Sequence, residues 1–245
     1  MKILHLDIET APHQVFSWGL WKQTISINQI AIPGRTICFA AQWEGQKKVH
    51  FYSEHHHGQE TMLEQAWKLL DEADVIVTYN GNHFDLPTLQ KEFVMAGMAP
   101  PSTFRTVDLI NTVRKQFRFA STKLDFVAQQ LGLGSKTKHA GMDLWVGCMG
   151  GCESAWRKMK QYNRQDVVLL SKLYRALLPW VKNHPSWAPY LDGDRPSCRN
   201  CGSEHVIKKG VERTNSGTYV RYRCADCNTP LRAATGGKTR KNRTV

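Results

Sequence analysis

The pattern of apolar and polar residues predicts strands at five places along the chain: the first by its alternation, and the fourth by a short apolar run bounded by turn signals. A strand with one buried face shows an apolar side chain at every second position. The second and third candidates are joined by a short connection, which indicates an antiparallel meander with the first. The five candidates are KILHLDI (2–8), RTICFAAQW (35–43), KKVHFYS (47–53), DVIVTY (74–79) and FRTVDLI (104–110).

Helical patterns separate and follow these strands. Between Met62 and Leu70, apolar residues recur at three- and four-residue spacing, which predicts an amphipathic helix over 60–73. Further helices are expected over 86–96, around 122–132 and from about residue 154 to 181. This order of elements is typical of an α/β fold with a mixed sheet.

The first strand carries two acidic residues on one face. Asp7 and Glu9 project from the same face as His5, whereas Leu6 and Ile8 take the opposite face. Burial of an unpaired carboxylate costs several kcal/mol, so two acids on a central strand predict a bound cation. An edge strand with a solvated acidic face is the alternative explanation.

Two later segments offer further acids. Asp85 follows the buried strand at 74–79, and Tyr162 and Asp166 lie one helical turn apart on one face. Each has an ordinary structural explanation: a helix cap for Asp85, a packing aromatic for Tyr162 and a surface acid for Asp166. Together with the acids of the first strand, however, they favour a shared cation site.

The segments LDIET (6–10), YNGNHFD (79–85) and YNRQD (162–166) resemble the three exonuclease motifs of the DEDDy branch of the DnaQ-like 3′-5′ exonucleases. This group contains polymerase proofreading domains and ribonuclease D. The resemblance extends over about residues 1–180 in order and spacing. It implies an RNase H-like fold, with a mixed five-stranded sheet flanked by helices.

The resemblance also implies two divalent cations, Mg²⁺ or Mn²⁺, roughly 4 Å apart across four carboxylates. In the family pattern, the residue matching Asp7 bridges both ions. The residues matching Glu9 and Asp166 bind the ion that activates water, and Asp85 binds the other. Tyr162 would hold the attacking water in line, because a phenol with a pKa of about 10 is a poor general base.

Contacts to the substrate are assigned by analogy and by residue type. Thr10, Asn80 and Phe84 match positions that meet the terminal nucleotide, although Phe84 is equally suited to the core and is expected there. Trp18 lies in an aromatic loop, VFSWGLWKQ (15–23), which suits either base stacking or a lid packed on the sheet. Lys123 and Asp108 are candidates for supporting the site.

Four of the seven cysteines form two Cys-x-x-Cys pairs separated by 22 residues, at Cys198/Cys201 and Cys224/Cys227. This spacing predicts a structural tetrahedral Zn²⁺ and, with two short strands joined by a turn at 215–217, resembles a zinc ribbon. A module this small needs the metal in order to fold. The segments CMGGC (148–152) and HHH (55–57) are expected in a loop and a turn, without metal.

Charge is unevenly distributed along the chain. Basic residues exceed acidic ones by 12 overall, and residues 192–245 hold 12 basic and 5 acidic residues. A surplus of this size indicates a polyanionic partner, nucleic acid before membrane. On the ribbon, basic residues alternate with Tyr219 and Tyr222, which suits phosphate contact and stacking. The absence of a membrane-spanning run or signal peptide predicts a cytoplasmic protein.

The predicted organisation is an exonuclease domain (1–182), a linker (183–196), a zinc ribbon (197–234) and a disordered basic tail (235–245). The predicted activity is two-metal-ion 3′-5′ exonucleolysis of nucleic acid at single-stranded 3′ ends, with DNA favoured over RNA and 5′-mononucleotides released. A replication or repair protein is a possible further partner. The alternatives are a non-catalytic nucleic-acid-binding adaptor and an RNase H-like endonuclease or transposase-type enzyme.

Overall fold

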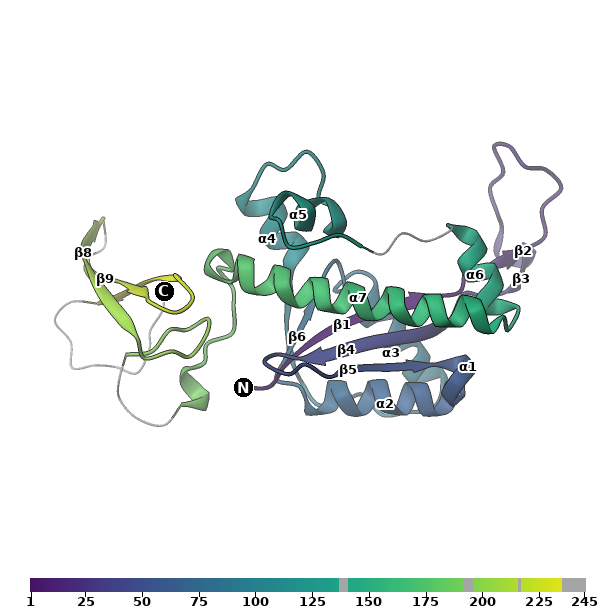
Figure 1. Ribbon diagram of the computed structural model, residues 1–245, viewed down its shortest axis with the longest axis horizontal. Helices are drawn as coiled ribbons and strands as arrows, with labels where there is room; N and C mark the ends of the chain where they lie inside the picture. Colours follow the sequence, from purple (N-terminus) through teal and green to yellow (C-terminus); the bar gives the residue numbers. More distant parts are fainter. Residues whose placement is uncertain (137–140, 192–195, 216, 235–245) are drawn as a thin grey trace.

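A computed structural model describes residues 1–136, 141–191, 196–215 and 217–234 (Figure 1). Its larger part is built on a five-stranded sheet in the order β5-β4-β1-β6-β7. β4 is antiparallel to both of its neighbours, whereas β1, β6 and β7 run parallel, so the sheet is mixed as predicted. The strands are β1 (Ile3–Thr10), β4 (Thr36–Trp43), β5 (Val49–Ser53), β6 (Val75–Thr78) and β7 (Arg105–Asp108).

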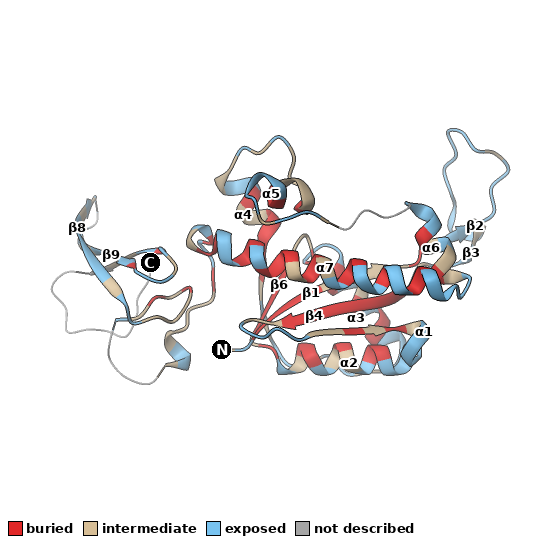
Figure 2. Cartoon of the chain, in the orientation of Figure 1, coloured by how far each residue is buried: buried red, intermediate tan, exposed pale blue. Residues whose placement is uncertain are grey.

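Helices cover both faces of this sheet, and the buried residues concentrate along the strands between them (Figures 1 and 2). The even-numbered apolar residues of β1, from Leu4 to Ile8, pack against α2 and α3 on one face. The opposite face of the sheet lies under α7. The helices are α1 (Glu54–His57), α2 (Gln59–Glu72), α3 (Asp85–Met95), α4 (Leu109–Gln116), α5 (Leu124–Gln130), α6 (Met142–Met149) and α7 (Glu153–Leu177).

The central place of β1 decides one question that the sequence left open. β1 is hydrogen-bonded to β4 on one side and to β6 on the other. The explanation of Asp7 and Glu9 as a solvated face of an edge strand is therefore wrong. Their side chains point to the face that α7 covers.

Several element boundaries differ from the prediction. The long helix ends at Leu177 and continues as a 3₁₀ turn, Leu178–Trp180, where Pro179 lacks the N–H that a helix interior requires. Helix α4 was not predicted, because Leu109 and Ile110 extend the apolar run of the strand before them. Segment 148–152 is not a loop throughout, since Cys148 lies in α6, and segment 55–57 forms the short helix α1.

The C-terminal part is a small three-stranded sheet in the order β10-β9-β8. It consists of β8 (Val206–Thr214), β9 (Gly217–Cys224) and β10 (Pro230–Ala234), and the third strand was not predicted. The predicted turn at 215–217 includes residue 216, which lies outside the described residues, as does the predicted tail at 235–245. A two-stranded hairpin, β2 (Gln14–Val15) and β3 (Ile30–Ile32), projects from the larger part (Figure 1).

Candidate active site

The carboxylates of β1 meet α7 at the C-terminal end of the strand. One carboxylate oxygen from each of Asp7, Glu9 and Asp166 lies within 4.8 Å of the other two. Asn163, one turn before Asp166 on α7, is fully buried and donates from Nδ2 to Oδ2 of Asp7 at 2.7 Å. Asn163 therefore holds the Asp7 carboxylate, and Asp166 of the same helix lies opposite it.

Asp85 brings a fourth carboxylate to the same strand end. Its Oδ1 accepts a hydrogen bond from the backbone N–H of Ile8 at 3.1 Å, between Asp7 and Glu9. The capping position of α3 belongs to Phe84, and Asp85 is the first residue of the helix. The carboxylate is thus directed at β1, and the explanation of Asp85 as a helix cap does not hold.

Burial and mutual repulsion raise the pKa of these carboxyl groups. The pKa of Asp7 lies well above its ordinary value, because of burial first and the charges of Asp85, Glu9 and Asp166 next. Burial, followed by repulsion from Asp166, raises the pKa of Glu9 to about 8. Burial likewise raises the pKa of Asp85 to about 6. A group of acids in this condition is stabilised by a cation placed among them.

Lys136 already places one positive charge there. Its Nζ lies 2.6 Å from Oδ2 of Asp166 and 3.4 Å from the hydroxyl of Tyr162. Burial acts to lower the pKa of Lys136, but the charges of Asp166 and Asp7 outweigh it and raise the pKa above its usual range. Sequence reasoning missed this residue and named Lys123, which is exposed at the start of α5. No local pattern around Lys136 distinguishes it.

The second oxygen of Asp166 shows that the site suits a further cation. Asp166 is 1% exposed, and its buried Oδ1 has no hydrogen-bond partner within the part of the chain that the structure describes. A buried carboxylate oxygen normally has a partner. Because the four carboxylates offer only hard oxygen donors, the residues fit Mg²⁺ or Mn²⁺.

Tyr162 lies over this group from α7. Its ring is buried and meets the ring of Trp145 edge to face at 6.2 Å between centroids. Burial, followed by the charge of Asp166, raises the pKa of Tyr162 above its ordinary value. The phenol therefore keeps its proton near neutral pH.

The turn between β6 and α3 is held by Asp108. Its two carboxylate oxygens accept the backbone N–H groups of Asn80, at 2.7 Å, and Asn82, at 3.2 Å. A Cβ at Gly81 would lie 2.4 Å from Cβ of Thr78, so only glycine fits there. Asp108 therefore holds the turn that leads to Asp85, and its role in supporting the site stays a prediction.

The other predicted substrate contacts are spread around this end of the sheet. The expectation that Phe84 belongs to the core is wrong, because its side chain is 45% exposed beside Asp85. Thr10 follows a bulge at the end of β1, where the pairing with β4 shifts after Glu9. Trp18 lies on the exposed tip of the β2–β3 hairpin.

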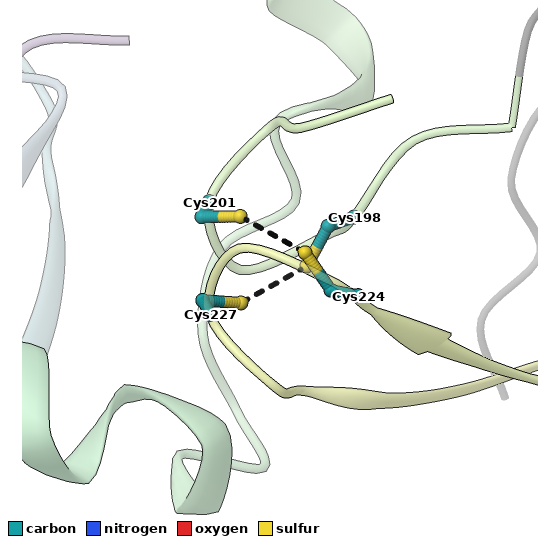
Figure 3. A group of neighbouring side chains, drawn as sticks. All are labelled: Cys198, Cys201, Cys224 and Cys227. Carbon is teal, nitrogen blue, oxygen red and sulfur yellow. Dashed lines mark hydrogen bonds between the residues drawn. The ribbon is translucent and has the colours of Figure 1, made fainter. Parts of the chain in front are cut away.

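The four paired cysteines form one cluster (Figure 3). Sγ of Cys198 lies 3.5 Å from Sγ of Cys227, and Sγ of Cys201 lies 3.6 Å from Sγ of Cys224. These distances are too long for disulfides, and all seven cysteines of the chain are free. Four thiols at this spacing are compatible with a tetrahedral Zn²⁺ and with a zinc ribbon.

The first cysteine turn is docked on the end of α7. Asn200 is 1% exposed, and its Nδ2 donates to the carbonyl of Leu178 at 2.7 Å and to that of Val181 at 3.3 Å. Trp187 donates from Nε1 to the carbonyl of Asn200 and packs against the core of the larger part. A Cβ at Gly202 would lie 3.0 Å from the Trp187 ring. Sequence reasoning missed Asn200, which ties the first cysteine turn to the segment that follows α7.

The strands of the C-terminal sheet expose a basic surface. Lys208, Lys209, Arg213, Arg221 and Arg223 are exposed, as expected for phosphate contact. The guanidinium of Arg232 lies over the ring of Tyr219 at 4.8 Å, so that this face of the ring is already covered.

A cleft of about 530 Å³ lies between the larger part and the first cysteine turn. Three cationic side chains, those of Arg105, Lys182 and Arg199, line it. None of them makes an ion pair with a carboxylate among residues 1–136, 141–191, 196–215 and 217–234. Its lining consists of Phe104, Arg105, Thr106, Lys182, Asn183, His184, Pro185, Ser186 and Arg199.

The histidines of α1 have a partner that their sequence neighbourhood does not show. Nε2 of His55 lies 2.7 Å from Oε1 of Glu153, the first residue of α7, and the His55 ring stacks on Trp156. His55, His56 and Glu153 thus form a group that could hold a metal ion, which their spacing in the sequence does not show.

Comparison with known proteins places the larger part in a family. A family model described as RNase_H superfamily matches residues 4–178. The chain belongs to the RNase H superfamily. This RNase H superfamily chain is also similar in fold to the family B DNA polymerase of the hyperthermophilic archaeon Pyrobaculum calidifontis, with a TM-score of 0.57 and 18% sequence identity. The likeness covers 73% of this chain and 24% of the polymerase. No curated protein matches the chain.

Within the described ranges, no helix has the length and apolar character that crossing a membrane requires.

Proposed function

We propose that this RNase H superfamily protein is a two-metal-ion 3′-5′ exonuclease. It hydrolyses phosphodiester bonds at single-stranded 3′ ends, DNA in preference to RNA, and releases 5′-mononucleotides. The observation that carries the proposal is that carboxylate oxygens of Asp7, Glu9 and Asp166 come within 4.8 Å of one another where β1 meets α7. Motif order, superfamily membership and the basic surplus of the chain support a nuclease acting on nucleic acid.

Asp7, Glu9, Asp85 and Asp166 would hold two Mg²⁺ or Mn²⁺ ions, which when bound supply an activated water and neutralise charge on the departing 3′ oxygen. The chain keeps these carboxylates in place beforehand. Asn163 fixes Asp7, and the N–H of Ile8 fixes Asp85. Such preorganisation reduces the rearrangement that the reaction requires.

Other side chains position the substrate. Tyr162, which keeps its proton, donates to the attacking water and orients it. Phe84 is exposed next to Asp85, so its ring is free to stack on the terminal base. The turn at Asn80 and Thr10 flank the approach to the same point, and Trp18 and Lys123 stay predicted contacts farther from it.

We assign the exonuclease to residues 1–182 and a zinc ribbon to 197–234, joined by the linker 183–196. One Zn²⁺ held by the four cysteines would fold the ribbon, whose exposed basic residues contact the nucleic-acid backbone. The cations that line the cleft at the junction, Arg105, Lys182 and Arg199, suit a phosphate chain that continues from one part to the other.

The test is degradation of a 5′-labelled single-stranded oligonucleotide in the presence of Mg²⁺ or Mn²⁺. The wild-type protein is expected to give a ladder that shortens from the 3′ end, and Asp166→Asn is expected to abolish it. Glu60→Gln, an exposed acid on α2, is the matched control and should retain full activity. Ladders that persist in Asp166→Asn would contradict the proposed site.

The same assay separates the alternatives. An endonuclease would release long fragments from a circular or 3′-blocked strand, which the proposed exonuclease leaves intact. A non-catalytic adaptor would bind the oligonucleotide without shortening it. The matching DNA and RNA strands report which sugar the site accepts.

A further inference from the structure

The β2–β3 hairpin ends in an apolar tip that contacts little of the protein. Phe16, Trp18, Leu20, Trp21 and Ile27 are between 76% and 102% exposed. Scattered apolar residues are ordinary on a surface, but a contiguous exposed group marks an interaction site. These five lie within twelve residues of one protruding segment (Figure 1).

The base of the hairpin, in contrast, is firmly held. Phe16 and Gln29 exchange hydrogen bonds of 2.8 Å and 2.9 Å, and the Gln29 side chain also accepts from the N–H of Ser26 at 2.8 Å. At the root, the N–H of Ala11 donates to the carbonyl of Arg35 at 2.8 Å. The protruding segment from Ala11 to Arg35, the arm, is therefore held by hydrogen bonds at its base.

The position of this arm relates it to the candidate active site. Its root, Ala11, comes two residues after Glu9, and the returning chain enters β4, the strand paired with β1. The arm consequently rises from the end of the sheet where the carboxylates gather.

The composition of the arm favours nucleic acid as its partner. The sequence from Thr10 to Trp43 contains no acidic residue and carries Lys22 at the tip, whereas Arg35 at the root is paired with Glu54. Indole rings stack on bases, and aliphatic side chains inserted beside a base step unstack it. An acid-free apolar tip with a basic residue suits a strand end whose bases are being separated.

We propose that the tip of the β2–β3 hairpin is a wedge that enters beside the terminal base pair of duplex nucleic acid and frees its 3′ strand for hydrolysis. This inference rests on the proposed exonuclease function. It extends the substrate class from single strands to the ends of duplexes. The aliphatic residues Leu20 and Ile27 press against the pair that opens, while the exposed rings stack on the unpaired bases.

The experiment compares 3′ shortening of a single strand, a blunt duplex and a duplex whose 3′ end carries three mismatched nucleotides. The tested variant is Leu20→Asn/Ile27→Asn in the full chain, because aliphatic side chains contribute little to stacking on a single strand. We expect its rate on the blunt duplex to fall about tenfold, the size of one lost base contact. Its rates on the single strand and on the mismatched duplex should stay within about twofold of the wild type, well inside that tenfold effect.

Val94→Asn/Met95→Asn is the matched control, since both side chains are 72% exposed on α3. It should change none of the three rates. An unchanged ratio of duplex to single-strand rates in the hairpin variant would overturn the wedge, as would an equal loss on all three substrates. A change in oligomeric state on size-exclusion chromatography with an unchanged ratio would assign the tip to a second copy of the chain instead. Failure of the wild-type protein to shorten the single strand would refute the exonuclease itself, a separate outcome.

Discussion

Replacing Glu9 with Gln is expected to stabilise the metal-free protein while abolishing nuclease activity. Glu9 is held among three other carboxylates, and burial, followed by repulsion from Asp166, raises its pKa from 4.5 to about 8. A raised pKa means that the folded protein binds this proton more tightly than the unfolded chain does. Ionised Glu9 therefore lowers the free energy of unfolding, and Gln, which resembles the protonated acid, does not.

The magnitude follows from the size of the shift. A shift of roughly 3.5 units at 1.36 kcal/mol each corresponds to about 5 kcal/mol at most. Because neighbouring acids adjust their own protonation when Glu9 is replaced, a gain on the order of 3 kcal/mol is expected at pH 8. For a domain of this size, that gain raises the Tm by roughly 6–12 °C.

The expected stabilisation depends on pH. Below pH 4.5 the group is protonated in both states, so Glu9→Gln gains nothing there. The gain should grow between pH 4.5 and 8 and then level off. Thermal unfolding in EDTA, followed by circular dichroism across this range, measures it, with Glu60→Gln as the exposed control.

Addition of Mg²⁺ completes the assay. The wild-type protein should gain Tm with Mg²⁺, because the cation neutralises the same carboxylates, and Glu9→Gln should gain less. A Glu9→Gln variant that unfolds at or below the wild-type Tm in EDTA at pH 8 would refute the reasoning that these acids repel one another.

Two further predictions concern Lys136 and the docked cysteine turn. Lys136→Met removes the ammonium 2.6 Å from Asp166, so the Mg²⁺ concentration for half-maximal thermal stabilisation should fall on the order of tenfold; an unchanged concentration would mean that Lys136 does not compete with the cation. Asn200→Ala removes two hydrogen bonds to the end of α7 and should cost about 1–3 kcal/mol of unfolding free energy, while metal analysis still finds about one zinc per chain. Cys198→Ser/Cys201→Ser should lose that zinc. Equal zinc loss in Asn200→Ala would contradict the separation of docking from metal binding.

The elements of the sheet could be predicted because their signals are local. A strand with one buried face shows a period of two, a strand buried on both faces shows a short apolar run, and an amphipathic helix shows a period near 3.6. All three patterns are visible within a few residues. All five strands of the main sheet were found in this way. Helix α4 was missed because its first turn, Leu109–Ile110, is as apolar as the strand before it, and burial does not distinguish the two.

The candidate site was predicted where residue type and spacing carry the chemistry. Asp7, Glu9, Tyr162 and Asp166 lie in short patterns whose geometry follows from one strand and one helix. The cysteine pairs are equally local. Lys136 and Asn200 were missed because their partners are about 30 and 20 residues away in the sequence, so no spacing connects them.

The sequence by itself therefore indicated the mixed α/β class, the set of acids and the four-cysteine cluster, because each rests on a repeat or on short motifs that can be read along the chain. The tertiary structure decided which of these residues lie together. Only the pairing of β1 on both sides placed Asp7 and Glu9 on a central strand, and only the packing of α7 brought Asn163 and Asp166 onto them. The exposure of Phe84 and of the hairpin tip was likewise settled in three dimensions, because apolar character does not reveal whether another surface is present to cover it.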